Sequence, residues 1–114
     1  MDFKQLLLVL ETNPEHVSFD DVISIIDNHF LFTPSGFTNG DLINDAGENS
    51  GSCKIFAFAK MHNLSQIQTL HCFGDYYRRD VLEKPDDSNH QNIRNFMRTG
   101  WDGIVFNHPA LREK

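Results

Sequence analysis

The chain has 114 residues and a formal net charge of −6, which fits one domain with a modest hydrophobic core and excludes two. The acidic balance excludes proteins that bind nucleic acid through a broad basic surface. The apolar run near the N-terminus is too short for a signal peptide or a membrane span, and the two cysteines lack metal-ligand spacing. We therefore expect a single cytoplasmic domain over residues 1–114, with reduced thiols and no cofactor, membrane or nucleic-acid contact.

The N-terminal third predicts two amphipathic helices. Apolar residues recur at helical spacing over residues 2–12, and Pro14 ends this pattern. Ser18 followed by Asp21 resembles a helix cap. The second helix then buries a stripe of four apolar side chains: Val22, Ile23, Ile26 and Phe30.

Turn residues dominate the next segment, and they predict short strands. Asn39-Gly40 lies between short apolar runs, the strongest local signal for a hairpin, because a type I′ turn needs positive φ at both central positions. Within residues 103–107, Ile104 and Val105 are β-branched and Phe106 is aromatic, as strand residues often are. We expect a small antiparallel sheet from residues 30–44 and 103–107.

Helices return after this segment. Residues 54–62 are apolar nearly all round, which predicts a buried central helix. Ser65 and Gln68 form a capping box that opens a helix through Tyr77. A last helix around residues 93–97 is stopped by Gly100, where a left-handed backbone costs least. The predicted fold class is α+β, mostly helical with one small antiparallel sheet.

A stretch of small polar residues precedes the central helix and suggests an anion site. Asn49, Ser50, Gly51 and Ser52 lie at its N-terminus, where backbone N–H groups favour negative charge. The alternative is structural, with Ser50 or Ser52 capping the helix. The segment GENSGSCK is not a phosphate-binding loop, because the spacing of its glycines and the position of its lysine both depart from that motif.

Cys53 offers a second chemistry. A thiol in the first turn of a helix is favoured as thiolate and could act as a nucleophile. His71 or His90 could serve as its base, and Asp75 or Asn92 could orient the imidazole. The alternative is that Cys53 is a buried packing residue, the commonest fate of a free cysteine.

The histidines raise the question of a metal. His71 and Asp75 are spaced i, i+4 on one helix face, and His90 could add a third ligand. Two ligands without a second clear pair are a weak signal, so we expect a hydrogen-bonded structural His71 and no metal. Four further histidines lie in or beside turns and are expected to face solvent: His16, His29, His62 and His108.

Polar side chains crowd residues 89–98. Arg94 can bind a carboxylate or phosphate through two parallel hydrogen bonds, with His90 beside it. It can equally tie down Asp75 or Asp80 within the protein. Because Ile93, Phe96 and Met97 occupy the buried face, some of these polar residues border the core.

Four segments, in order, resemble one known family. FTNGDLIND, NSGSCKIFAFAKMHNLS, QTLHCFGDYYRRDVL and HQNIRNFMRTGWDGIVF resemble the HopJ family, named for a type III effector of plant-pathogenic bacteria. The resemblance covers nearly the whole chain. It implies a compact α+β domain of a bacterial protein, and it adds secretion into a host cell by a type III system as an alternative to a cytoplasmic location.

Two classes of function remain from the sequence. One is a non-enzymatic domain that binds a small anionic ligand or a protein partner through residues 49–53 and residues 90–94. The other is a thiol-dependent hydrolase or transferase built on Cys53. We favour the first, because the sequence shows a plausible binding surface without a complete catalytic set.

Overall fold

Five α-helices form most of the secondary structure in the computed structural model, which describes all residues 1–114. They are α1 (Phe3–Thr12), α2 (Phe19–His29), α3 (Ser50–Met61), α4 (Gln66–His71) and α5 (Gln91–Thr99). Shorter helical segments are η1 (Pro14–His16), the π-helical η2 (Tyr76–Val81) and η3 (Gly100–Gly103). None of them has the length and apolar run that a membrane-spanning helix requires.

Five short strands complete the α+β fold that the sequence predicted. They are β1 (Phe30–Phe32), β2 (Phe37–Asn39), β3 (Leu42–Asn44), β4 (Ile104–Phe106) and β5 (Leu111–Glu113). One antiparallel sheet has the order β3-β2-β4, with Phe37 opposite both Asn44 and Phe106. This confirms the predicted pairing of residues 30–44 with 103–107. The separate β1–β5 pair was not predicted, since residues 111–113 carry no β-pattern.

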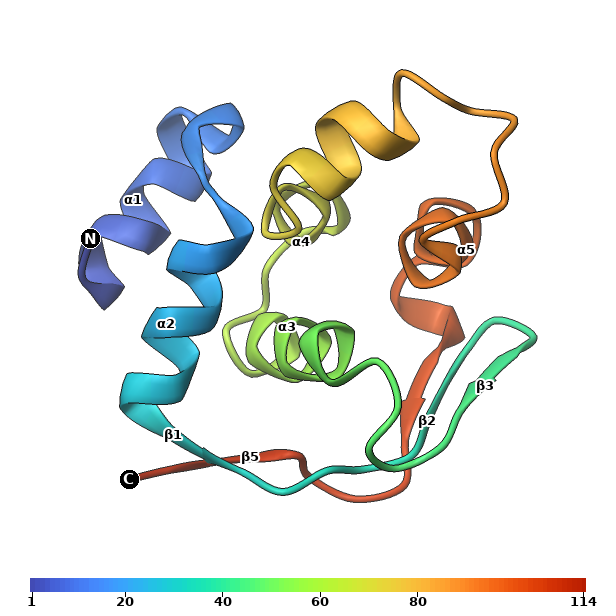
Figure 1. Cartoon of the computed structure of the whole chain (residues 1–114). Helices are drawn as coiled ribbons and strands as arrows, with labels where there is room; N and C mark the ends of the chain where they lie inside the picture. The colour runs from blue at the N-terminus through green and yellow to red at the C-terminus, as the bar shows by residue number, and fades with distance from the viewer.

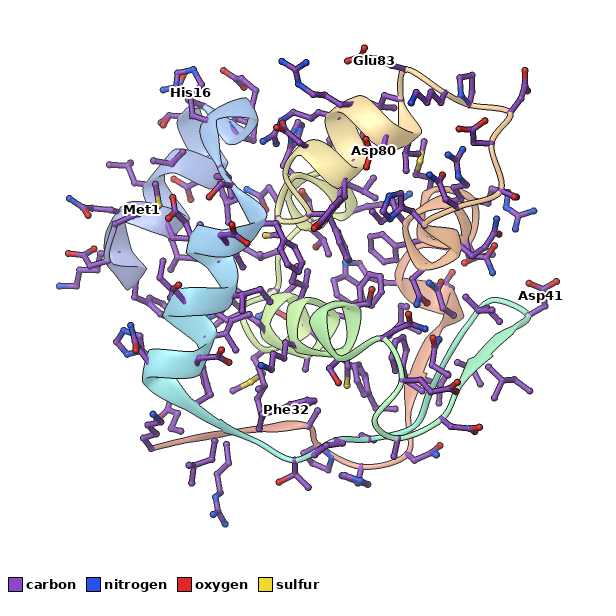
Figure 2. All side chains as sticks on the ribbon, in the orientation of Figure 1. Met1, His16, Phe32, Asp41, Asp80 and Glu83 are labelled. Atoms are coloured by element: carbon purple, nitrogen blue, oxygen red, sulfur yellow. The ribbon has the colours of Figure 1, made fainter.

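The hairpin turn lies one residue later than predicted. Asn39 pairs with Leu42, so the two central residues are Gly40 and Asp41. Gly40 has a φ of +62°, whereas neither Asn39 nor Asp41 has a positive φ. A positive φ at the first central position alone is typical of a type II′ turn rather than type I′. Asp41 therefore occupies the tip of the hairpin (Figure 2), and Asn39 is a buried residue at the end of β2.

Helix α3 is the centre of the core, as predicted. Figure 1 shows it between the α1–α2 pair and α5. The Phe56 ring lies 4.9 Å from Phe96 and 5.4 Å from Phe73, measured between ring centroids. Because α3 begins at Ser50, its first turn includes the small polar residues.

The predicted single helix from Ser65 to Tyr77 is wrong beyond its first two turns. The capping box of Ser65 and Gln68 is present, but α4 ends at His71. Gly74 then takes a φ of +60°, and a Cβ added there would lie 2.7 Å from the backbone nitrogen of Phe19. Because the two backbones lie so close, only glycine fits at position 74. The left-handed backbone of Gly74 interrupts the helix, and η2 follows it.

The prediction that His62 faces solvent is wrong. Its ring lies 4.8 Å from the rings of both Phe3 and Phe58, and its Nε2 has no hydrogen-bond partner. Burial lowers the pKa of His62, because a charged imidazolium loses hydration among these rings. The C-terminal end of α3 is therefore closed by aromatic packing.

Candidate functional site

The first turns of α3 and α5 meet at one cavity of about 370 Å³, which we call the interhelical cavity. Its polar wall consists of Asn49, Gly51, Ser52, His90, Gln91 and Asn92. Its apolar wall consists of Phe19, Leu42, Phe73, Tyr76 and Ile93. This volume lies at the lower end of the range for small-molecule sites. Four residues of the predicted ligand site thus share one cavity: Asn49, Gly51, Ser52 and His90.

Both helices enter this cavity with the same backbone geometry. Asn49 precedes α3 with φ 50° and ψ 49°, and His90 precedes α5 with φ 52° and ψ 48°. Neither side chain caps its helix. The predicted capping by Ser50 or Ser52 is therefore wrong, because Asn49 occupies the N-cap position and no side chain caps the helix. No side chain therefore satisfies the N–H groups of either first turn.

The left-handed backbone at these two positions is costly. A residue other than glycine in this region is destabilised by roughly 1–2 kcal/mol, less for asparagine. Only three such residues occur in the chain, Asn49, Asn63 and His90, and two of them line the cavity. A switch between left-handed and right-handed backbone arranges successive N–H groups as a concave nest for anions. Strained residues of this kind concentrate at functional sites.

A network of asparagines, of which Asn39, Asn44 and Asn92 are buried, holds the two helix starts together. Asn44 Oδ1 accepts hydrogen bonds from Asn49 Nδ2 at 2.8 Å and from Asn92 Nδ2 at 3.0 Å. Asn44 Nδ2 donates to Asn92 Oδ1 at 3.1 Å. Asn39 Nδ2 donates to the Asn92 carbonyl oxygen at 2.8 Å, while its own Oδ1 has no partner. The β2–β3 hairpin therefore fixes the distance between α3 and α5.

His90 connects the cavity to η2. Its Nε2 lies 3.1 Å from Oδ2 of Asp80, a residue of η2 (Figure 2). The His90 ring lies 5.2 Å from the Tyr76 ring, and Tyr76 in turn meets Phe19 edge-on at 5.1 Å. This row of rings forms one side of the cavity and restrains the orientation of the imidazole.

The cavity wall contains no charged side chain except His90 when it is protonated. This is notable in a chain with 16 aspartates and glutamates. The neighbouring cavity of about 470 Å³ has three carboxylates in its wall, those of Glu15, Asp20 and Asp75. The two cavities share Phe19 and Tyr76 but differ in electrostatic character. The helix N-termini therefore supply the fixed partial charge of the interhelical cavity.

Cys53 lies outside the cavity wall. Its side chain is 2% exposed, and its thiol donates a hydrogen bond to the Ser35 carbonyl oxygen at 3.7 Å. Burial raises the pKa of Cys53, which opposes formation of a thiolate. Neither His71 nor His90 forms a hydrogen bond with it. The thiol therefore lies in the first turn of α3 but not in the wall of the interhelical cavity.

His71 and Asp75 have separate partners. His71 Nδ1 lies 3.0 Å from the Arg78 guanidinium, and burial together with the Arg78 charge lowers the pKa of His71. Asp75 Oδ1 lies 3.9 Å from Nε of Arg79. Because His90 pairs with Asp80, the three residues of the metal hypothesis do not converge, and no group of three such donors occurs in the structure.

Arg94 stabilises a loop and does not line the interhelical cavity. Its guanidinium donates to Asn89 Oδ1 at 2.8 Å and to the carbonyl oxygens of Pro85 and Asp80 at 3.2 and 3.3 Å. The predicted tie to Asp80 exists, but through the backbone rather than the carboxylate. All of these partners precede α5, so Arg94 anchors the segment that leads into it.

Sequence reasoning missed the aromatic side of the site. Phe19 and Tyr76 look like ordinary core residues by spacing, and no local pattern places them beside residue 90. The signal that existed was Gly51, since a Cβ there would lie 2.9 Å from the Phe19 ring. A glycine in the first turn of a helix indicates close approach of another group.

Comparisons with known proteins cover the whole site. The model of the family described as HopJ type III effector protein matches residues 3–111. A solved structure described as "Crystal structure of unknown function protein VPA0580" is 50% identical, with a TM-score of 0.97, and the similarity covers 100% of this chain and 95% of that chain. A search of curated proteins gave no match. Both matches include every element that lines the interhelical cavity.

Proposed function

We propose that this chain, which belongs to the HopJ family, binds a small anionic ligand in the interhelical cavity. One observation carries the proposal: the first turns of α3 and α5 converge on this cavity, and neither has a side-chain cap. An anion between them would accept hydrogen bonds from N–H groups of both helices and lie at the positive end of both helix dipoles.

The shape of the site supports a small ligand over a macromolecular partner. Small-molecule sites are concave and mostly apolar, with a few polar groups that fix orientation. The interhelical cavity combines both kinds of wall, because Phe73, Tyr76 and Ile93 line it together with the two polar helix starts. The burial of Cys53 outside the wall favours ligand binding over thiol-dependent catalysis.

The family description bears on the cell in which the domain binds its ligand. A type III effector is secreted into a host cell, so this description supports secretion as the alternative to a cytoplasmic location in the producing cell. We infer that the domain meets its ligand in the cytoplasm of one of these two cells. A translocation reporter fused to the chain, compared in cells with and without the secretion apparatus, distinguishes the two locations.

The binding site is tested by placing a charge in it. Sulfate and phosphate titrations, followed by amide NMR shifts, should perturb the N–H groups of residues 50–52 and 91–92. Ser52→Asp puts a carboxylate at the start of α3, which the helix dipole tolerates but a bound anion does not. We expect this variant to stay folded and to lose at least tenfold in anion affinity.

Gln68→Glu is the matched control for this experiment. It also adds one negative charge to the first turn of a helix, and glutamate preserves the capping box at the start of α4. Gln68 lies outside the cavity wall, so anion affinity should not change. Equal affinities in the Ser52→Asp variant and the parent chain, or shifts confined to other residues, would overturn the proposed function.

A further inference from the structure

We propose that His90 is a charge-dependent ligand contact, so that the interhelical cavity binds a fully ionised oxyanion tightly when His90 is protonated and weakly when it is neutral. This inference rests on the proposed function and adds to it the regulation of the site. It follows from the position of His90 in the cavity wall and from its pairing with Asp80.

The pairing fixes the tautomer of the neutral ring and leaves Nδ1 as the nitrogen available to a ligand. With Nε2 3.1 Å from the Asp80 carboxylate, the neutral ring places its single proton on Nε2, since a carboxylate accepts hydrogen bonds and cannot donate one. Nδ1 has no hydrogen-bond partner in the protein and is then a bare acceptor. An acceptor lone pair repels an oxyanion, so neutral His90 opposes the ligand that the helix starts attract.

Protonation reverses this effect. In the imidazolium both nitrogens donate, so Nε2–H keeps Asp80 and Nδ1–H becomes free for the ligand. A hydrogen bond to an ionised group is stronger than a neutral one. The same protonation event therefore replaces a repulsive lone pair with a charged donor. Imidazole is the side chain that ordinarily changes charge between about pH 5 and pH 8, so a comparison of affinities across this interval tests the effect.

The groups around His90 allow it to act in this way. Two groups of η2 contact His90, the Asp80 carboxylate and the Tyr76 ring. Arg94, from α5, donates a hydrogen bond to the carbonyl oxygen of Asp80. The α3 wall opposite is uncharged, with Asn49, Gly51 and Ser52. A bound anion therefore faces one titratable cation and no carboxylate in the wall itself.

Sulfate is the probe, because it stays a dianion across the whole pH range, whereas phosphate changes its own charge. Sulfate affinity is measured by calorimetry or NMR titration at about pH 5.5 and about pH 8. We expect binding about tenfold tighter at the lower pH, the factor that corresponds to a hydrogen bond gaining a charged donor. Binding at both pH values with equal affinity would overturn this inference and leave the proposed function intact. No binding at either pH would overturn both.

His90→Asn removes the titratable ring and keeps a residue that tolerates the left-handed backbone at this position. It should abolish the pH dependence and leave the weak affinity of the neutral state. His108→Asn is the control, since His108 is exposed and lies outside the interhelical cavity. It should retain the full pH dependence.

A measurement on the unmodified chain covers the case in which a variant fails to fold. Coupling between proton and anion is reciprocal, so sulfate must shift protonation of His90 to higher pH if protonation tightens sulfate binding. The ring proton resonances of His90 and His108, followed over pH with and without sulfate, report both sites at once. We expect a shift for His90 alone. An unchanged His90 titration in saturating sulfate, or an equal shift at His108, would refute a direct contact.

Discussion

The two ends of α3 are built in opposite ways. At its C-terminal end the helix passes into His62, which phenylalanine rings enclose, and three residues later Ser65 opens α4 with a reciprocal capping box. At its N-terminal end Asn49 holds a left-handed backbone, no side chain caps the helix, and α5 begins beside it in the same manner. One end is closed by the protein's own groups, and the other is left open at a cavity.

This difference separates stability from binding. A capping box satisfies helix N–H groups within the chain and therefore stabilises the fold. The uncapped N-termini of α3 and α5 leave their N–H donors available to a ligand. The strain of the two left-handed residues is not offset by a cap. The asparagine network around Asn44 supports the open end instead. Mutations at the closed end should consequently change the free energy of unfolding, whereas mutations at the open end should change ligand affinity.

The largest effect is expected where the open end depends on support from the hairpin. Asn44→Ala leaves Nδ2 of the buried Asn92 without this partner, and an unpaired buried group costs about 1–3 kcal/mol. We expect the free energy of unfolding, measured in urea, to fall by about 1–3 kcal/mol. Asn28→Ala, at an exposed position of α2, should change it by less than about 0.5 kcal/mol.

The same variant tests whether the network also positions the site. Sulfate affinity of the folded fraction should fall as well, because the two helix starts lose their common anchor. A variant that loses stability but binds sulfate normally would show that the network supports the core and does not set the geometry of the cavity.

A smaller effect is expected at the closed end. Ser65 Oγ accepts a hydrogen bond from the Gln68 N–H at 3.1 Å, and loss of such a cap typically costs about 1 kcal/mol. Thermal or urea unfolding of Ser65→Ala should show this loss without any change in sulfate affinity. Ser88→Ala, exposed and without a side-chain bond, is the matched control and should be neutral. If Ser65→Ala were equally neutral, the closed end would not owe its stability to the cap.

At the closed end the capping box was predictable from sequence but the packing of His62 was not, and the open end was predictable only in part, for a physical reason. The capping box joins two residues only three positions apart, so Ser65 and Gln68 reveal it directly. The left-handed starts at Asn49 and His90 and their convergence depend on Asn44, which bonds Asn92 from 48 positions away in the chain. No local pattern encodes a contact of that separation.

The errors in the predicted fold have the same origin. The turn moved from Asn39-Gly40 to Gly40-Asp41 because Asn39 is held in the network by Asn92 and so ends a strand. The helix from Ser65 broke because Gly74 packs against the backbone of Phe19. In both cases a tertiary contact overrode a sound local preference. The central helix and its apolar burial, which depend on composition, were predicted correctly.

Acid should weaken the closed end through His62. Its folded-state pKa lies below the unfolded value near 6.5, so the unfolded chain binds more protons as the pH falls through that interval. The stability that neutral His62 supports is present above about pH 6.5 and is lost as pH falls through the lower folded-state pKa. His62→Phe, which keeps the aromatic packing, should show a smaller loss of stability between about pH 7.5 and pH 5 than the parent chain. An unchanged pH dependence would mean that His71, whose pKa is also lowered, accounts for the effect.

The smallest effect on stability is expected at the open end, and it is the sharpest test of the comparison. Ser52 lies in the first turn of α3, as Gln68 does in α4, but its side chain forms no hydrogen bond with the protein and faces the cavity. Ser52→Ala should therefore change the free energy of unfolding by less than about 0.5 kcal/mol, with a slight gain because alanine is the better helix former. Sulfate affinity should fall by about two- to tenfold, since the hydroxyl donor is lost. If the variant instead lost about 1 kcal/mol, as Ser65→Ala should, Ser52 would be acting as a cap after all. The N-terminal end of α3 would then be closed by the protein itself, and the argument for a ligand there would fail with it.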